Sequence, residues 1–192
     1  MIINGKMIPK IKEKLGTFHS LFRGCRLKAE WWEEVLFQTF QECGYENVEW
    51  RPHTHGRGKD IDVNDIRISC KGGQIVNKRF KDGIKKCLSL SSHRTTSQKT
   101  LEEKLDVISE KLVDIYFCLA NPNPKDKDNL KYKLYIFDAK ILNFRGLEWE
   151  EKKGGWKATG KFLARIEKSM SHQLWFDIPI ELLSEGIDMG DY

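Results

Sequence analysis

The feature that most constrains this fold is the stretch GKDIDVNDIRISCKGG at positions 58–73. It holds two short runs of strand-forming residues, 60–63 and 66–71, which are joined by Asn64 and Asp65. The side chains of Asn and Asp tolerate the backbone angles of a tight turn. The stretch therefore predicts a β-hairpin with a two-residue loop.

Side chains alternate across a strand, so this hairpin has two chemically different faces. The apolar face, which we expect in a core, consists of Ile61, Val63, Ile66, Ile68 and Cys70. The polar face consists of Asp60, Asp62, Arg67, Ser69 and Lys71. In the predicted register Asp60 lies opposite Ser69 and next to Lys71. Burying such charges together is costly unless a metal ion and a phosphate sit among them.

An acidic residue that opens one strand of a hairpin, with a lysine in the next strand, resembles the PD-(D/E)XK nuclease superfamily. This superfamily includes type II restriction endonucleases and archaeal Holliday-junction resolvases. Lys59-Asp60 stands where the family has Pro-Asp, and Ser69 stands where most members carry Asp or Glu. A serine in that position is known in a subset of restriction enzymes. The resemblance implies an α/β domain with a central mixed β-sheet flanked by helices, built on an αβββαβ core.

The segment 27–43, LKAEWWEEVLFQTFQEC, predicts an amphipathic helix that Gly44 ends. Its apolar stripe consists of Trp32, Val35, Leu36, Thr39, Phe40 and Cys43. At 100° per residue, Glu34 falls opposite the stripe, Glu30 lies well round from it, and Glu33 sits at its edge. A border position such as that of Glu33 can reach a partly buried site.

The order of elements adds to the resemblance. The helix precedes an apolar strand near Val48 to Trp50, a polar glycine-rich loop and then the hairpin. This succession is similar to the αβββ opening of resolvases and of many restriction enzymes, in which the helix contributes a metal-binding glutamate. The resemblance assigns that role to Glu33, with Glu30 as the alternative.

The resemblance also implies a metal site and a set of catalytic groups. The residues expected to carry catalysis are Asp60, Lys71, Glu33 and Ser69. The metal ligands expected are Asp60, Glu33 and the backbone carbonyl of Cys70, with Asp62 as an additional candidate because Ser69 offers only a neutral oxygen. Mg²⁺ is the expected cofactor, with Mn²⁺ as a substitute, because Mg²⁺ favours one or two carboxylates plus waters and phosphate oxygens. Lys71 would orient and help to deprotonate the attacking water, or stabilise charge on the phosphate.

Length and charge indicate how the chain is organised and what it binds. At 192 residues it is expected to form a single domain, with a core over about 27–140 and a C-terminal extension over 141–192. Residues 51–100 carry twelve Lys and Arg against four Asp and Glu, whereas the rest of the chain is nearly neutral or slightly acidic. A basic field centred on a carboxylate cluster suits a nucleic acid.

Residues 75–99 are ambiguous in secondary structure. They are compatible with a helix to about Lys86 followed by a strand through Leu90, or with one long helix weakened by Gly83. The polar residues after this cationic segment are of the types that contact phosphates and base edges, although an ordinary surface loop would look the same. The residues expected to contact DNA are Arg57, Lys59, Ser92, His93, Arg94 and Thr95.

Other patterns outline the remaining elements. Residues 7–22 are compatible with a short helix, and Thr100 to Glu103 is a capping-box signature for another. The further strands are expected at 113–120, 131–139 and 173–178, with a hairpin over 147–158 that turns at Gly154-Gly155. Trp149 and Trp156 are expected to pack across that hairpin, with stacking on nucleic-acid bases as the alternative.

Compartment is indicated by what the sequence lacks. The apolar runs are too short for a membrane span, and residues 1–14 do not resemble a signal peptide, so a cytoplasmic protein is expected. Its five cysteines are spread out without a CxxC pair, which favours reduced thiols over a structural zinc site. There is no P-loop and no GxGxxG motif, so no nucleotide cofactor is expected.

These observations favour a Mg²⁺-dependent type II restriction endonuclease that cuts double-stranded DNA as a homodimer, since a palindromic site asks for a two-fold partner. The nearest rival is a Holliday-junction or repair nuclease of the same fold. A third hypothesis is a DNA-binding relative that has lost catalysis, for which Ser69 is the best evidence. The simplest reading is a domain whose acidic pair and lysine are ordinary surface charges.

Overall fold

The computed structural model describes residues 3–50, 60–122 and 130–192. Its helices are α1 (Met7–Leu21), α2 (Ala29–Glu42) and α3 (Leu101–Glu110). Its strands are β1 (Val48–Trp50), β2 (Ile61–Val63), β3 (Ile66–Phe80), β4 (Gly83–Arg94), β5 (Ile115–Asn121), β6 (Lys131–Asp138), β7 (Glu148–Lys152), β8 (Gly155–Thr159), β9 (Leu163–Glu167), β10 (Gln173–Pro179) and β11 (Ile187–Asp191). The α/β class with a mixed β-sheet and flanking helices is thus confirmed.

All eleven described strands belong to one sheet. Its order is β11-β6-β5-β3-β4-β10-β9-β8-β7, and β1 and β2 extend it beside the start of β3. β3 and β5 run parallel, and the neighbouring pairs along the rest of the sheet are antiparallel. Residues after 140 are part of this sheet, because β10 pairs with β4 and β11 pairs with β6.

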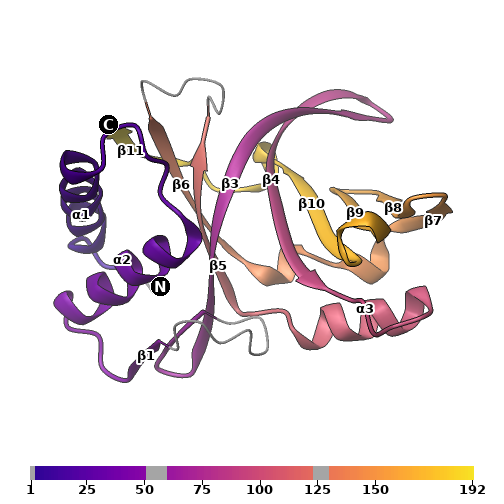
Figure 1. The fold of residues 1–192 in the computed structure, drawn as a ribbon, viewed down its shortest axis with the longest axis horizontal. Coiled ribbons are helices and arrows are strands. Elements are labelled where there is room, and N and C mark those ends of the chain that lie inside the picture. The colour runs from indigo at the N-terminus through magenta and orange to yellow at the C-terminus, as the bar shows by residue number, and fades with distance from the viewer. Residues whose placement is uncertain (1–2, 51–59, 123–129) are drawn as a thin grey trace.

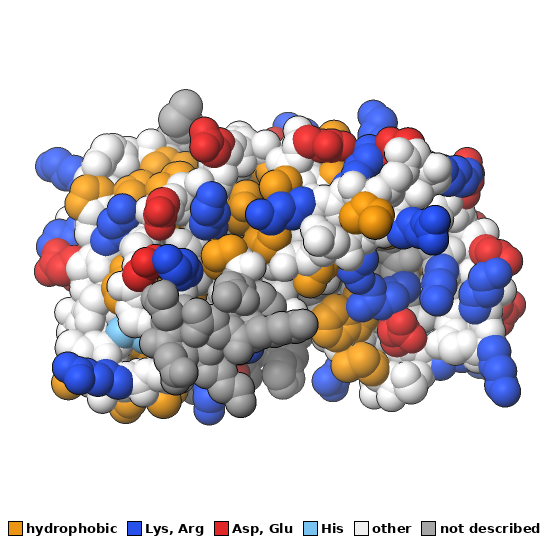
Figure 2. Space-filling view, turned by 90° about the horizontal axis from the view of Figure 1, so that it is seen from above, with side chains coloured by type: hydrophobic (Ala, Val, Ile, Leu, Met, Phe, Trp, Pro, Cys, Tyr) orange, Lys and Arg blue, Asp and Glu red, His pale blue; other side chains and the backbone are white. Residues whose placement is uncertain are grey.

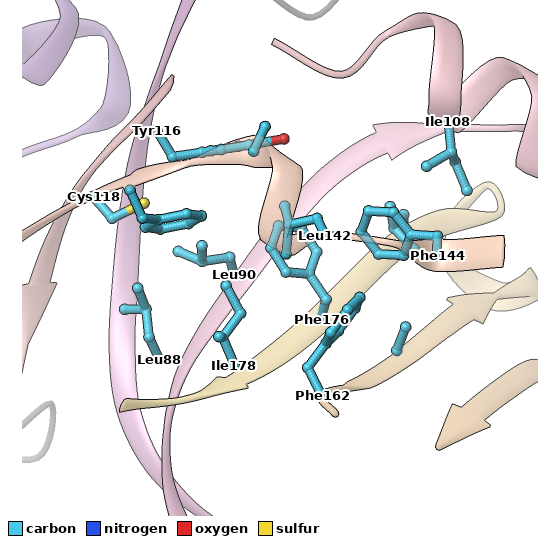
Figure 3. Packing of buried hydrophobic residues seen from close by; sticks show 14 of the residues in the cluster. Leu88, Leu90, Ile108, Tyr116, Cys118, Leu142, Phe144, Phe162, Phe176 and Ile178 are labelled. Atoms are coloured by element: carbon cyan, nitrogen blue, oxygen red, sulfur yellow. The ribbon is translucent and has the colours of Figure 1, made fainter. Parts of the chain in front are cut away.

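The sheet curls around one of two apolar clusters (Figure 1). On the outer face α1 and α2 cover β2, β3, β5 and β6, burying Met7, Ile11, Trp32 and Leu36. On the inner face, side chains from both halves of the sheet meet those of α3; Figure 3 shows Tyr116 from β5 near Leu90 of β4 and Phe176 of β10. β3 therefore separates two cores, and the polar face of the predicted hairpin turns toward the inner one.

The β2–β3 hairpin forms with the predicted register. Val63 lies opposite Ile66, and the two-residue turn consists of Asn64 and Asp65. Both turn residues have positive φ, 48° and 65°, in the left-handed region that Asn and Asp tolerate best after glycine. The predicted helices, with the capping box at Thr100, also form.

Both predictions of a helix after Gly73 were wrong. β3 continues to Phe80, a two-residue turn follows, and β4 returns antiparallel with Gly83 opposite Phe80. Gly83 has φ of 133°, which other residues rarely adopt, so it permits this tight return. Leu88 and Leu90 are buried, while Ser89 and Ser91 on either side of Leu90 are half-buried, and this period of two is that of a strand. Only the predicted strand through Leu90 survives, as part of β4.

The predicted hairpin over 147–158 forms, but its turn lies one residue earlier than expected. Gly155 pairs with Lys152, so Lys153 and Gly154 make the turn. A Cβ atom on Gly155 would stand 1.8 Å from the carbonyl oxygen of Ile166, which is why glycine occupies this strand position. The strands β9 and β11 were not predicted. No helix of the described residues is long and apolar enough to cross a membrane.

Candidate functional site

The candidate site lies at a break in one edge of β3. On this edge residues 66–68 pair with β2 and residues 74–80 pair with β4, while the opposite edge pairs with β5. Between the two partners, no strand of the described part of the chain pairs with residues 69–73 on this edge. Among the described strands, this edge of β3 is therefore without a partner at the point where β2 ends and β4 turns away.

Asp60 stands directly at this break. Its backbone N–H donates to the carbonyl oxygen of Ile68, at 2.9 Å, which fixes the residue against β3. Its Oδ2 atom accepts hydrogen bonds from Ser69 Oγ (3.0 Å), Cys70 N–H (2.6 Å) and Lys71 Nζ (3.4 Å). The structure thus brings together Asp60, Ser69 and Lys71 as the hairpin register predicts.

Glu33 approaches the same place from α2. Its carboxylate is half-buried and its Oε2 accepts a hydrogen bond from Trp50 Nε1, at 3.4 Å. Burial raises the pKa of Glu33, and the negative charge of Asp60 raises it further, whereas the Trp50 hydrogen bond and the Lys71 ammonium act in the opposite direction. Glu33 therefore lies within electrostatic reach of both groups. Glu30, the alternative, is exposed.

The residues at the break fit a hard divalent cation. The three hydrogen bonds to the Asp60 carboxylate all fall on Oδ2, so Oδ1 accepts none from the described residues. Glu33 adds a second carboxylate, which the charge of Asp60 repels and which a cation would stabilise. Among described residues no group of three or more His, Cys, Asp or Glu is placed to hold a metal. Two carboxylates with water and phosphate oxygens match the coordination habit of Mg²⁺.

Cys70 and Ser69 take different places around Asp60. The N–H and C=O of one strand residue point to the same edge, so the Cys70 carbonyl faces the break together with its N–H. The Cys70 thiol is buried in the outer core, and this burial raises its pKa. Ser69 is buried, and its hydroxyl is used to hold the Asp60 carboxylate.

Asp62 lies on the polar face of the hairpin but further along it. It is opposite Arg67 in the β2–β3 register, and its negative charge raises the pKa of Arg67. Arg67 in turn binds both carboxylate oxygens of Asp114, at 3.2 and 3.3 Å. Asp62 therefore belongs electrostatically to the Arg67–Asp114 pair, which ties the hairpin to the start of β5.

His93, which was expected to contact DNA, lies within electrostatic reach of Lys71. Its imidazole is half-buried, and its Nε2 atom is buried without a hydrogen-bond partner among described residues. Burial is the main cause that lowers the pKa of His93 to about 4, and the positive charges of Lys71 and Lys111 add to it. His93 is thus a neutral side chain near the proposed catalytic lysine.

The other residues expected to contact DNA separate into three groups. Thr95 is buried, and its hydroxyl donates to the carbonyl oxygen of His172 at 3.0 Å, so it stabilises the fold. Ser92 is half-buried and its hydroxyl faces that of Tyr116, whereas Arg94 is exposed. Arg57 and Lys59 lie outside the described residues.

The sequence reasoning missed two side chains that shape the site. Trp50 orients Glu33 through its indole N–H, and it could have been found from the pairing of β1 with β2, in which Trp50 lies opposite Ile61. The position of His93 depends on a β-bulge in the β4–β10 pairing, where Gln173 and Trp175 pair with Arg94 and Ser91. A bulge re-aims side chains and has no clear signal in one sequence.

Comparisons with known proteins give no relative for this chain. No family model, no curated protein and no solved structure matches it. The functional conclusion therefore rests on the geometry of Asp60, Lys71 and Glu33.

Proposed function

We propose that this protein is a Mg²⁺-dependent endonuclease that hydrolyses phosphodiester bonds at specific sites in double-stranded DNA, in the manner of a type II restriction enzyme. One observation carries the proposal. Asp60 and Lys71 are in contact at 3.4 Å, with Glu33 in electrostatic reach, at an unpaired edge of β3. An acid pair beside an amine is the set of groups that metal-assisted phosphodiester hydrolysis needs.

Each group has a distinct role in this proposal. Asp60 and Glu33, with the Cys70 carbonyl, would hold Mg²⁺, which when bound neutralises phosphate charge and lowers the pKa of a water. The hydrogen bonds from Ser69 and Cys70 N–H keep the Asp60 carboxylate in one orientation. Lys71 would orient the attacking water and stabilise the negative charge that grows on the phosphate in the transition state.

The topology around the site supports the resemblance to PD-(D/E)XK nucleases. A glutamate-bearing helix, three strands with the hairpin, a crossover helix and a strand parallel to β3 follow one another along the chain. The difference is β4, an additional strand between β3 and α3. In this proposal β4 joins the half of the sheet that carries Asp60 and Lys71 to the half formed by β7 to β10.

The charge distribution supports DNA as the substrate. Residues 51–100, which include β2, β3 and β4, carry a net charge of +8. Figure 2 shows Lys and Arg side chains spread over one face, with Asp and Glu side chains among them. The net positive charge of residues 51–100 attracts a polyanion and makes its binding dependent on salt. A homodimer would place two such sites on a palindromic sequence.

The direct test is cleavage of plasmid and phage DNA of known sequence with Mg²⁺. The wild type should give a fixed set of fragments, EDTA should abolish them, and Lys71→Ala and Asp60→Ala should each lose at least about 99% of the activity, as expected when a group that stabilises the transition state is removed. Lys86 is an exposed lysine on β4, the strand that pairs with β3. Lys86→Ala is therefore the matched control and should cut normally. Undiminished cutting by Lys71→Ala would refute the site.

Two other outcomes would identify the alternatives. Cutting of four-way junctions or damaged DNA, with intact duplex left alone, would indicate a junction or repair nuclease. Binding of duplex DNA without cleavage over a range of metals would indicate a DNA-binding relative that has lost catalysis. The second alternative is favoured by one observation, that Ser69 contributes a hydroxyl engaged with Asp60 where a third carboxylate would strengthen metal binding.

A further inference from the structure

A polar groove lies in the fork where β3 and β4 separate. The two strands stay paired down to Gln74 opposite Ser89, and beyond that point β4 continues with β10 only. The groove has a volume of about 440 Å³ and opens on the outer face of the sheet. Its wall includes Gly72, Gly73, Ser89, Ser91, Tyr132 and Trp175. It begins one residue after Lys71 at the same edge of β3, but it lies on the outer face of the sheet, whereas the Lys71 side chain points to the inner face.

Trp175 lines this groove, and its indole N–H is a hydrogen-bond donor without a partner in the described part of the chain. Its Nε1 atom is buried and has no acceptor among the described residues. The Arg165 guanidinium lies 5.2 Å from the centre of the indole ring, on the side of the neighbouring strand β9. The groove lies on the other side, over β4. A buried donor without a partner is costly, so it marks the place where an external acceptor is expected.

Gly72 keeps the groove open from the β3 side. A Cβ atom on Gly72 would meet nothing within 4 Å, whereas one on Gly73 would stand 2.9 Å from the side chains of Leu88 and Leu90. The backbone of Gly72 points to the same edge as that of Cys70, because the two are two residues apart in one strand. The floor of the groove is therefore an edge of β3 without a partner among the described strands, where the backbone N–H and C=O of Gly72 are a hydrogen-bond donor and acceptor.

The rest of the groove wall combines polar and apolar side chains, as a binding site for a flat ring with polar edges does. Ser89, Ser91 and Gln74 supply hydroxyl and amide groups, while Leu27 and Leu119 supply apolar surface. Sites for small ligands typically measure about 300–1,000 Å³ and combine apolar walls with a few polar groups. A groove of about 440 Å³ is too small to hold a DNA duplex. It is suited to a single nucleobase, whose faces are apolar and whose edges carry donors and acceptors.

We propose that the groove holds one unpaired nucleobase of the substrate strand, with Trp175 Nε1–H donating to an acceptor on the edge of the base. This inference rests on the proposed function for its choice of substrate, and it adds that a base leaves the helical stack at this edge of β3 and enters the outer face of the sheet, opposite the face of Lys71. Extrusion of a base costs a few kcal/mol, and contacts in a fitted pocket compensate for this cost.

The test is equilibrium binding of a fluorescein-labelled single-stranded DNA octamer of mixed sequence in EDTA, followed by fluorescence anisotropy. Trp175→Phe keeps the ring and removes the donor, so it should weaken binding about two- to tenfold. Gly72→Leu fills the groove and should weaken binding on the order of tenfold or more. Trp31→Phe, at a tryptophan that packs on Phe18 between α1 and α2, is the matched control and should bind as the wild type does.

The outcomes separate this inference from the proposed function. Wild-type affinity in both Gly72→Leu and Trp175→Phe, or no binding of the octamer by the wild type, would overturn the groove assignment even if duplex DNA is cut. Groove-dependent binding in a protein that cuts no DNA would support the groove and refute the nuclease. Thermal melting of Gly72→Leu checks that it folds, and Trp175→Phe decides the question if it does not.

Discussion

At the scale of single residues, the site is a set of polar groups held together by burial. Asp60 is fixed by three donors, Glu33 is fixed by Trp50, and Lys71 contacts Asp60 and acts electrostatically on the neutral imidazole of His93. The charged groups near His93 are both cationic, Lys71 and Lys111. Protonating His93 would therefore place a third positive charge in a half-buried space, which the fold resists.

This resistance predicts a pH dependence of stability. The folded pKa of His93 is lowered to about 4 from 6.5, so between these values the unfolded state binds the additional proton and stability falls as the pH falls. The loss between pH 7.5 and pH 4.5 should be on the order of 2 to 3 kcal/mol larger in the wild type than in His93→Gln. Urea denaturation at the two pH values measures it. Equal losses in both proteins would show that His93 titrates freely in the folded state.

At the scale of elements, β3 determines the position of the site. Along one edge β3 pairs first with β2 and then with β4, and the site lies between these two partners. The other edge of β3 pairs with β5. The hairpin start of β3 was predictable because Asn64 and Asp65 set the turn and the turn sets the register. The contact between Asp60 and Lys71 follows from that register.

The rest of β3 was not predictable from local pattern. The lysines and arginines of residues 75–86 are good helix formers, and so the local sequence favours a helix. The strands β3 and β4 are stabilised by their pairing and by ion pairs to distant residues, such as Lys78 with Asp177. The separation of β4 from β3 depends on β10, whose residues pair with β4 residues that lie 79 to 92 positions earlier in the sequence. Pairing between strands that distant leaves no signal in a single sequence, and so neither the groove nor the position of His93 could be foreseen.

The fork between β3 and β4 predicts opposite effects at two adjacent glycines. Gly73→Val should destabilise the protein by about 1–3 kcal/mol, because its side chain would press on Leu88 and Leu90, which are buried. Gly72→Val should cost no more than about 0.5 kcal/mol, because its side chain enters open space. Chemical denaturation of both variants measures the difference. A destabilisation at Gly72 as large as at Gly73 would contradict the described packing.

At the scale of the whole molecule, one sheet joins two cores and places the site between them. The outer core, under α1 and α2, positions Glu33 and Cys70, and the inner core, under α3, positions Tyr116 behind the polar face of β3. Glu33 on α2 and Asp60 beside β2 therefore come together through the packing of α2 against β2 and β3 in the outer core. This arrangement predicts that metal binding requires the folded chain and both carboxylates.

The most direct measurement of that claim is an electron paramagnetic resonance titration with Mn²⁺, which distinguishes free from bound ion at weak affinity. The wild type should bind Mn²⁺, and Asp60→Asn and Glu33→Gln should each weaken binding about tenfold or more. Asp65→Asn, at an exposed carboxylate in the hairpin turn, should leave binding unchanged. Mn²⁺ binding by Asp60→Asn and Glu33→Gln at wild-type affinity would contradict the account.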